Sequence, residues 1–272
     1  MRTKKNGRSD EVALITGASG GIGYELAFCF AKDGYDLVLV ARREKELQKL
    51  AGEIREKYSV RVTVIAKDLA APSAPGEIFS ELRQAGVKVD ILVNNAAFGT
   101  YGFFVRNDVA RELEQIRLNV SALTHLTALF AAGMVSRKKG KILNVASTAA
   151  FQPGPLMAVY YASKAYVLSF SEALSSELKG SGVTVTCLCP GPTRTGFDKV
   201  AALEKLKVPK ANVMSAAKVA EIGYRALMKG RTVVIAGFGN KLVALGAKLA
   251  PRSWSTAVSR MILETAGISK LQ

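Results

Sequence analysis

The feature that most constrains this chain is a regular alternation between two apolar patterns. Short runs rich in Val, Ile and Leu have the length of strands, and longer stretches between them repeat apolar side chains every three or four residues, as a helix does. The predicted strands are 12–15, 36–40, 60–66, 90–93, 141–146, 183–188 and 232–235. The predicted helices are 22–31, 44–58, 75–85, 107–134, 159–179, 216–229 and 240–264, the last with a break at Pro251.

Strand–helix alternation of this kind is typical of right-handed βαβ units. It predicts an α/β fold: a single-domain Rossmann fold with a doubly wound parallel sheet of about seven strands and helices on both faces. We expect residues 1–10 to form a flexible basic tail, 11–237 the Rossmann domain and 238–272 a helical extension packed on the domain, on another subunit or on a membrane surface. Ligands of such sheets bind beyond the carboxyl ends of the strands, so the residues after each strand are the candidate site.

Composition narrows the class of protein. Hydrophobic residues make up 49% of the 272 residues, which supplies a buried core and excludes disorder of the whole chain. Three cysteines, Cys29, Cys187 and Cys189, form no disulfide framework and suit the reducing cytoplasm. We expect no secretory signal and no membrane-spanning segment, because no apolar run of sufficient length is visible. A single histidine, His125, argues against a metal site, and we predict none.

The first predicted strand ends in a glycine-rich turn that opens a helix. Glycine lets the backbone turn tightly and come close to a pyrophosphate, and the free N–H groups of a helix N-terminus favour an anion. A strand–turn–helix context near the start of a Rossmann domain is the one that gives such a turn meaning. We therefore predict a dinucleotide-binding turn made by Gly17, Ser19, Gly20, Gly21, Ile22 and Gly23.

The residues after the second strand bear on the kind of dinucleotide. A carboxylate at this place binds a free ribose 2′-hydroxyl, and here Ala41 stands instead, followed by Arg42 and Arg43. A guanidinium group matches the oxygens of a 2′-phosphate, so the pattern favours NADP(H) over NAD(H). The alternative is that both arginines only begin the charged face of the next helix.

The remaining strand ends also carry small or polar residues. Asp68 and Leu69 follow the third strand, where a carboxylate can accept a hydrogen bond from an adenine amino group. Asn95 and Ala96 follow the fourth and allow close approach to a ribose, and Ser147 follows the fifth. After the sixth strand we add four further candidate cofactor-binding residues: Pro190, Gly191, Thr193 and Thr195.

Taken in order, these motifs resemble those of the short-chain dehydrogenase/reductase family, TGxxxGxG, NNAG, YxxxK and PG. The chain reads TGASGGIG, NNAA, YYASK and PGPTRT, and the resemblance extends over about residues 11–237. Ala97 departs from the family's glycine by one methyl group. The chain is most similar to a broad bacterial set of reductases related to long-chain 3-oxoacyl and hydroxysteroid reductases. The resemblance implies an NADP(H)-dependent oxidoreductase, EC 1.1.1.-, and a homodimer or homotetramer.

The resemblance also implies a catalytic tetrad of Asn119, Ser147, Tyr160 and Lys164. A free tyrosine has a pKa near 10, and a neighbouring ammonium such as that of Lys164 favours the phenolate and lowers this pKa. Helix geometry leaves Tyr160 and Tyr161 both able to face Lys164. The family's spacing selects Tyr160 as acid/base, and Tyr160 and Lys164 then also contact the cofactor. The alternative is a protein that binds NADPH as a sensor or scaffold without turnover.

Apolar residues after the strands indicate the substrate. A ketone or secondary alcohol of hydrophobic character suits a pocket with many aromatic side chains. The candidate substrate residues are Phe98, Phe151, Met157, Tyr161 and Phe197.

Charge is concentrated toward the C-terminus. The net charge is +16, and residues 199–272 contain 13 Lys/Arg against three Asp/Glu. This balance suits a solvated face, an acidic substrate or an anionic membrane surface. No nucleic-acid-binding motif is visible, so we predict no nucleic-acid partner. The apolar stretch 241–254, with spaced cations and Trp254, has two interpretations: subunit packing, or peripheral contact with a membrane.

Overall fold

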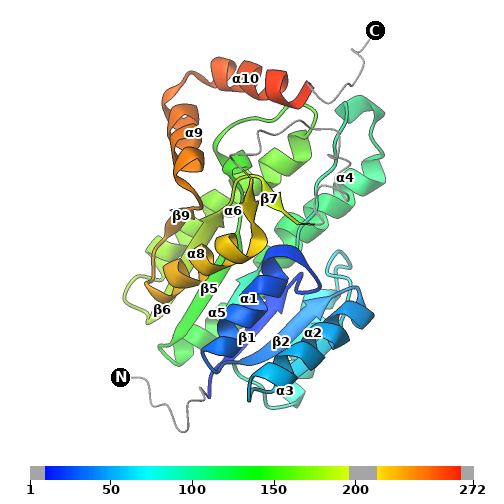
Figure 1. Ribbon diagram of the computed structural model, residues 1–272, viewed down its shortest axis with the longest axis vertical. Helices are drawn as coiled ribbons and strands as arrows, with labels where there is room; N and C mark the ends of the chain where they lie inside the picture. The colour runs from blue at the N-terminus through cyan, green and yellow to red at the C-terminus, as the bar shows by residue number, and fades with distance from the viewer. Residues whose placement is uncertain (1–9, 196–212, 265–272) are drawn as a thin grey trace.

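The computed structural model describes residues 10–195 and 213–264 and shows one parallel sheet covered by helices on both faces (Figure 1). The sheet has seven strands in the order β3-β2-β1-β4-β5-β6-β9. The predicted Rossmann-type α/β fold is confirmed, including the number of strands. Residues 1–9 of the predicted tail 1–10, the substrate candidate Phe197 and the last residues 265–272 lie outside the described residues.

The elements follow one another as strand and helix along most of the chain. The strands are β1 Val12–Thr16, β2 Asp36–Ala41, β3 Val62–Ala66, β4 Val89–Asn94, β5 Gly140–Val145, β6 Val183–Cys189 and β9 Val233–Ile235. The helices are α1 Gly21–Lys32, α2 Glu44–Lys57, α3 Ala74–Gln84, α4 Val109–Ile116, α5 Leu123–Ser136, α6 Ala158–Glu177, α8 Ala216–Met228, α9 Phe238–Leu249 and α10 Arg252–Glu264. Short pieces not expected from the sequence are η1 Phe104–Arg106, η2 Arg117–Ala122, η3 Thr148–Phe151, and the paired two-residue strands β7 Thr193–Arg194 and β8 Met214–Ser215.

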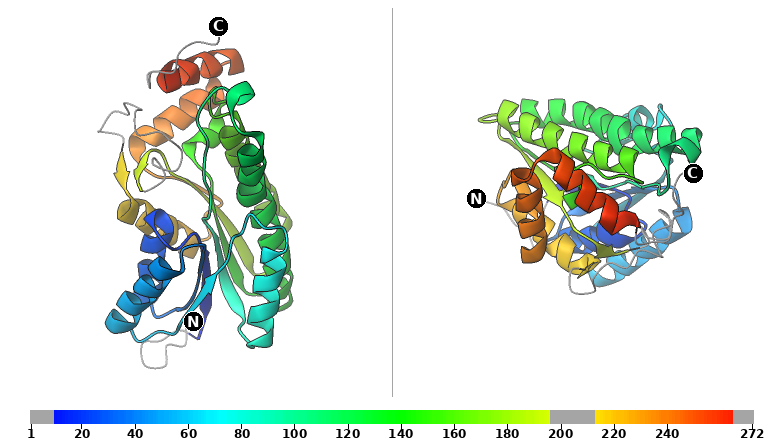
Figure 2. Two further views of the ribbon diagram at one scale, coloured as in Figure 1. Left: turned by 90° about the vertical axis from the view of Figure 1, so that its right-hand side faces the viewer. Right: turned by 90° about the horizontal axis from the view of Figure 1, so that it is seen from above.

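Two apolar layers hold the helices to the sheet (Figure 2). On one face α1, α2 and α8 pack on the inner strands through side chains such as Leu26, Leu47 and Val219. On the other face α3 and α5 pack through side chains such as Ile78 and Leu126. The strands are buried on both faces, which explains why β2 reads as an uninterrupted apolar run after Asp36.

The helix predicted at 107–134 is a composite of α4, the π-helical segment η2 and α5. Together Val109–Ser136 is long and apolar enough to cross a membrane by length and composition, since an 18-residue window within it has mean hydropathy 1.5. The fold supplies another reason for its apolarity, because Leu126, Phe130 and Met134 of α5 are buried against the sheet and α3. We therefore interpret it as a core helix of the domain.

The strand order reverses between β1 and β4, and ligands of open α/β sheets bind beyond the carboxyl ends of the strands at such a point. The chain runs outward from β1 to β3 and then crosses back to β4, so the strand order reverses at this point. The last two helices, separated at Pro251 as expected, lie over the carboxyl ends of the other half of the sheet (Figures 1 and 2). Lys248 of α9 lies 5.1 Å above the Phe151 ring, which follows β5.

Candidate active site

The glycine-rich turn after β1 has no room for side chains. Gly17 has φ +66°, and a Cβ there would lie 2.8 Å from Asn95 Nδ2 and 2.9 Å from Ala96 Cα. A Cβ on Gly23 would lie 2.5 Å from the Gly17 carbonyl oxygen. The neighbouring strand ends are tied together, because Thr16 Oγ1 accepts the backbone N–H groups of Asn95 and Ala96 at 2.9 and 3.0 Å. The turn is thus a backbone-lined surface held in place by short polar side chains.

Two distant residues complete this turn. Arg43 Nη2 donates to Ser19 O at 3.0 Å and to Ser19 Oγ at 3.1 Å, and its guanidinium is 3.2 Å from where a Cβ of Gly20 would stand. Thr195 lies on the other side, where its Cβ and Cγ2 would be 3.1 Å from a Cβ on Gly21. Ile22 follows in the first turn of α1 and packs against the core. The structure therefore brings together candidates from the ends of β1, β2 and β6.

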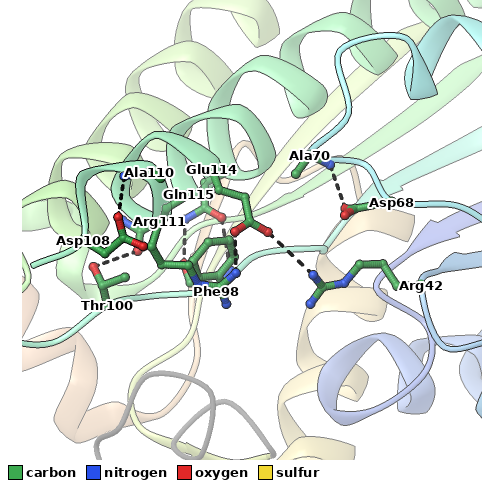
Figure 3. Close-up of polar contacts among 11 residues, drawn as sticks. Arg42, Asp68, Ala70, Phe98, Thr100, Asp108, Ala110, Arg111, Glu114 and Gln115 are labelled. Atoms are coloured by element: carbon green, nitrogen blue, oxygen red, sulfur yellow. Dashed lines mark hydrogen bonds and ion pairs between the residues drawn. The ribbon is translucent and has the colours of Figure 1, made fainter.

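Arg42 points away from this turn toward α4 (Figure 3). Its Nη1 lies 3.6 Å from Glu114 Oε1, and Glu114 also pairs with Arg111. The Arg111 guanidinium in turn lies 3.9 Å from the centre of the Phe98 ring. Glu114 and Arg111 belong to no recognised motif, so the sequence did not predict their place near the site. They connect the candidate 2′-phosphate residue Arg42 to the segment after β4.

Asp68 and Leu69 after β3 have separate surroundings. Asp68 Oδ1 accepts the Ala70 backbone N–H at 3.0 Å, which fixes the carboxylate at the strand end (Figure 3). Leu69 is 5% exposed and packs with the core on the α3 side. Asp68 and Arg42 follow the carboxyl ends of the adjacent strands β3 and β2 (Figure 3).

The Pro190–Gly191 turn after β6 is fixed by its neighbours. Pro190 O accepts the Thr148 N–H at 2.8 Å, and Thr193 Oγ1 donates to Gly191 O at 2.8 Å. A Cβ on Gly191 would lie 2.4 Å from the Asn240 side chain, which is itself buried and donates to Ala236 O at 2.7 Å. Asn240 on α9 therefore supports this turn. Its position far along the chain gave no sign of that contact.

Tyr160, Ser147 and Lys164 meet at the ends of β5 and α6. The Tyr160 hydroxyl and the Ser147 side chain share a hydrogen bond. Lys164 Nζ lies 5.8 Å from the centre of the Tyr160 ring and donates to Val145 O at 2.8 Å. Tyr161 packs edge to face on Tyr160, and its ring fills the space beside Gly154, where a Cβ would be 2.3 Å away. The structure thus brings Tyr160, rather than Tyr161, to Ser147.

The pKa values of this group follow mainly from burial. Loss of hydration raises the pKa of Tyr160 to about 12, and the hydrogen bond from Ser147 opposes that rise. Burial lowers the pKa of Lys164 to about 8. The expected downward shift of the Tyr160 pKa is therefore wrong for the protein alone, because desolvation of the phenol outweighs the hydrogen bond from Ser147. At neutral pH the Tyr160 phenol carries its proton.

Asn119 lies in the π-helical segment between α4 and α5. Its Oδ1 accepts the Phe98 N–H at 3.1 Å, and its Nδ2 donates to Phe98 O at 2.9 Å and to Ser163 Oγ at 3.1 Å. The wider π turn lets the side chain reach both the segment after β4 and α6. Asn119 therefore connects the cofactor side of the site to the helix that carries Tyr160 and Lys164.

The predicted substrate residues lie in different surroundings. Phe98 is 3% exposed beneath Arg111, so the structure shows it as a packing residue rather than part of an open pocket wall. Phe151 packs beside β6 under Lys248. Met157 belongs to an apolar cluster that also contains six further residues, which are Tyr101, Phe103, Leu156, Tyr160, Tyr161 and Leu263.

Leu263 is the unexpected member of this cluster. It comes from α10, about a hundred residues after Tyr160 in the sequence, and is 5% exposed. The Tyr101 hydroxyl donates to the Leu263 carbonyl oxygen and fixes the helix over the cluster. A helical extension was predicted, but nothing in its sequence singles out Leu263 from the other apolar residues of the same helix.

The arrangement fits a dinucleotide. The glycine turn offers bare backbone at the start of α1, Arg43 lies beside it, and the close approach at Gly17 and Gly23 excludes side chains from the same place. Next to it a phenol, a hydroxyl and an ammonium converge where a carbonyl group could be protonated. The fold is therefore that of a Rossmann-type protein, with a candidate nucleotide site and a candidate acid/base group beside it.

Comparison with known proteins gives the family. A family model described as short chain dehydrogenase matches residues 11–205. The chain therefore belongs to the short-chain dehydrogenase family of oxidoreductases, as the motifs indicated. The relatives described below come from fungi and bacteria, so the narrower bacterial subgroup stays a prediction.

Individual relatives cover most of the chain. A very-long-chain 3-oxoacyl-CoA reductase of Pyrenophora tritici-repentis is 36% identical over 78% of this chain and 63% of that protein. A short-chain dehydrogenase of Sphingobium yanoikuyae, solved with NADPH, has TM-score 0.79 and 34% identity over 86% of this chain and 92% of that one. A bulky-bulky ketone specific alcohol dehydrogenase of Comamonas testosteroni has TM-score 0.75 and 33% identity over 85% of this chain and 90% of that chain. The chain thus spans about 63% of the length of the first relative.

Proposed function

We propose that this protein is an NADP(H)-dependent reductase of a hydrophobic ketone, with Tyr160 as the proton donor. The observation that carries the proposal is the contact of Tyr160 with Ser147 beside Lys164, next to the glycine turn. When bound, the reduced cofactor supplies a hydride to the carbonyl carbon. The protein's part is to hold the carbonyl oxygen at Ser147 and to donate the Tyr160 proton to it, so that the product is a secondary alcohol.

The protonation states support the direction of reduction. A phenol with a raised pKa keeps its proton at neutral pH and can give it to a developing alkoxide. Lys164 lies close enough to stabilise the phenolate that this transfer leaves behind. Asn119 acts as a positioning residue, because its amide holds the Phe98 backbone and Ser163 rather than the reacting group.

The preference for NADP(H) rests on two arginines with different partners. The Arg43 side chain lies on the glycine turn, whereas the Arg42 side chain pairs with Glu114 of α4. Both guanidinium groups stand at the end of β2, where a carboxylate would favour a free 2′-hydroxyl. The solved relative that carries NADPH has the same fold at 34% identity, which supports the assignment.

The proposed substrate is a large apolar carbonyl compound. The cluster around Met157, Tyr161 and Leu263 adjoins Tyr160 and consists of apolar and aromatic side chains. The names of two relatives, a very-long-chain 3-oxoacyl-CoA reductase and a bulky-bulky ketone specific alcohol dehydrogenase, point to the same chemical class. We extend that class, and no individual substrate, to this chain.

The test is NADPH oxidation against aliphatic, aromatic, steroid and 3-oxoacyl carbonyls. Tyr160→Phe removes the proton donor while keeping the ring, and we expect kcat to fall by about 10²–10⁴-fold. Tyr161→Phe is the matched control, because its ring packs on Gly154 and should keep most activity. Loss of activity in Tyr161→Phe alone would overturn the assignment. Tight NADPH binding without turnover of any carbonyl would favour the sensor or scaffold alternative.

We also propose a cytoplasmic homo-oligomer. The outer faces of α4 and α6 support this, because Val109, Leu113, Ile116 and Tyr166 are exposed there although they are large and apolar. Burial of such residues between subunits would remove them from water. Light scattering of wild type and Leu113→Glu tests the idea: a dimer or tetramer that dissociates in the variant supports it, and a monomeric wild type contradicts it.

A further inference from the structure

Helices α9 and α10 expose an unusual amount of apolar surface. Among the described residues sixteen large apolar side chains are exposed, and nine of them belong to these two helices. Leu249 is 78% exposed and Trp254 is 70% exposed. We call the exposed apolar side of the two helices the cap surface, defined by Leu242, Leu245, Leu249, Trp254, Val258 and Met261. A surface of this kind on an otherwise well-packed domain requires a partner.

The cap surface follows helical geometry. Leu242, Leu245 and Leu249 are spaced three and four apart, and so are Trp254, Val258 and Met261. The inward positions of the same helices, such as Ala244 and Ser259, are buried. Apart from Leu263, the buried positions of both helices are small or polar, whereas the large apolar side chains lie on the outer side. Packing on the domain does not explain the outer side.

Charge distinguishes the partner. Residues 238–264 contain four cations, Lys241, Lys248, Arg252 and Arg260, and one acid, Glu264. Glu264 already pairs with Arg260 at 2.7 Å. In a two-fold dimer the surface would meet its own copy and set these cations against each other. An anionic lipid bilayer instead accepts the apolar side chains among its acyl chains and the cations at its headgroups.

We propose that the cap surface docks on an anionic lipid bilayer and that the active site takes its substrate from that bilayer. The link is α10, whose outer side carries Trp254 and Met261 while Leu263 closes the cluster beside Tyr160 and Met157. The second half of the statement rests on the proposed function and narrows its substrate to an apolar carbonyl compound dissolved in lipid. The docking itself does not depend on turnover.

The single tryptophan of the chain makes docking directly measurable. Trp254 is the only tryptophan of the sequence and lies within the cap surface, so tryptophan fluorescence reports on the surroundings of this surface alone. Titration of the full-length protein with phosphatidylcholine vesicles containing phosphatidylglycerol should shift the emission to shorter wavelength. Brominated acyl chains should quench it. Vesicles of phosphatidylcholine alone, or high salt, should weaken binding by about tenfold or more, because the cations contribute through electrostatic attraction.

Substitutions separate the possible partners. The double variant Leu249→Glu/Met261→Glu places negative charge on the cap surface. It should lower the affinity for anionic vesicles by about tenfold or more. Val135→Glu, at an exposed apolar position outside the cap surface, should bind as wild type. Circular dichroism and NADPH binding confirm that the variants are folded. No fluorescence shift with anionic vesicles would overturn the proposal, and so would an oligomer that dissociates in Leu249→Glu without any lipid binding.

The substrate half of the proposal has its own readout. If a long-chain ketone is turned over, anionic vesicles that carry it should raise the turnover rate of the wild type. The same vesicles should leave the rate of the double variant Leu249→Glu/Met261→Glu unchanged. If vesicles do not raise the wild-type rate, the protein does not take its substrate from the bilayer. The docking measured by fluorescence would remain valid. Docking without turnover of any ketone would instead contradict the proposed function and leave the docking surface intact.

Discussion

The two halves of the carboxyl edge of the sheet are built by different forces. On the nucleotide half, Thr16, Asn95 and Arg43 hold a glycine turn by hydrogen bonds, and bare backbone forms the surface. On the substrate half, apolar side chains from distant segments pack on one another, with Leu263 of α10 over Met157. The first half depends on geometry that one methyl group can disturb. The second depends on apolar area and tolerates change that keeps the area.

This difference matters for function. A nucleotide is the same molecule in every relative, so a fixed turn can recognise it, whereas substrates vary and an apolar wall can be rebuilt from any helix that lies nearby. Here that wall comes from the C-terminal helices. The following substitutions test whether the two halves respond in these different ways.

The largest effect is expected for the buried ammonium between the halves. The folded pKa of Lys164 is about 8, below its ordinary value of 10.5, so the unfolded chain binds more protons between these two pH values. Stability must therefore rise with pH across that window, by up to about 3 kcal/mol. Lys164→Met removes the titrating group. Urea unfolding at about pH 7.5 and 9.5 should show wild type gaining stability relative to the variant.

Titration of Tyr160 changes stability in the opposite sense to Lys164 and therefore limits the pH range of the measurement. Its folded pKa of about 12 lies above the ordinary value of 10, so its contribution is present below pH 10 and is lost as the pH rises toward 12. The comparison is best made below pH 10 for this reason. Parallel stability curves for wild type and Lys164→Met would contradict the buried, weakly basic state of Lys164.

A matched pair of glycines tests the geometric half. Gly17→Ala places a Cβ 2.8 Å from Asn95 Nδ2 at φ +66°, so we expect a loss of about 1–3 kcal/mol in unfolding free energy and weaker NADPH binding. Gly52→Ala lies in α2 with nothing within 4 Å of the new methyl group, and it should gain about 0.5–1 kcal/mol. Denaturant unfolding and fluorescence titration with NADPH measure both. Equal behaviour of the two variants would show that the turn is not sterically fixed.

Two apolar residues of one helix test the other half. Leu263→Ala should raise KM for a long apolar ketone by about tenfold, since a buried leucine loses roughly 1.5–3 kcal/mol of apolar contact. NADPH binding should not change, because Leu263 belongs to the substrate cluster. Met261→Ala is the control in solution, as its side chain is 64% exposed. Weakened NADPH binding in Leu263→Ala would show that the two halves are not separable.

The sequence predicts the nucleotide half far better than the substrate half, and the reason is locality. The glycine turn, its strand and its helix lie within about twenty consecutive residues, and the parallel sheet follows from alternation alone. By contrast, Leu263 and Asn240 reach the site from the end of the chain, and no local pattern marks them. The π turn that aims Asn119 was also invisible, because it reads as ordinary helix in the sequence. Long-range contacts of this kind appear only once the fold is known.

The smallest expected effect concerns Glu114, which pairs with Arg42 on the nucleotide half. Glu114 holds Arg42 at 3.6 Å and also pairs with Arg111, so it competes with a 2′-phosphate for the same guanidinium (Figure 3). Glu114→Gln should strengthen NADPH binding by about two- to fivefold, as an exposed ion pair is worth up to about 1 kcal/mol, and should leave NADH binding unchanged. Glu81→Gln on α3 is the control. Equal gains for both cofactors would mean that Arg42 does not read the 2′-phosphate, and the preference for NADP(H) would then depend on Arg43 at the glycine turn.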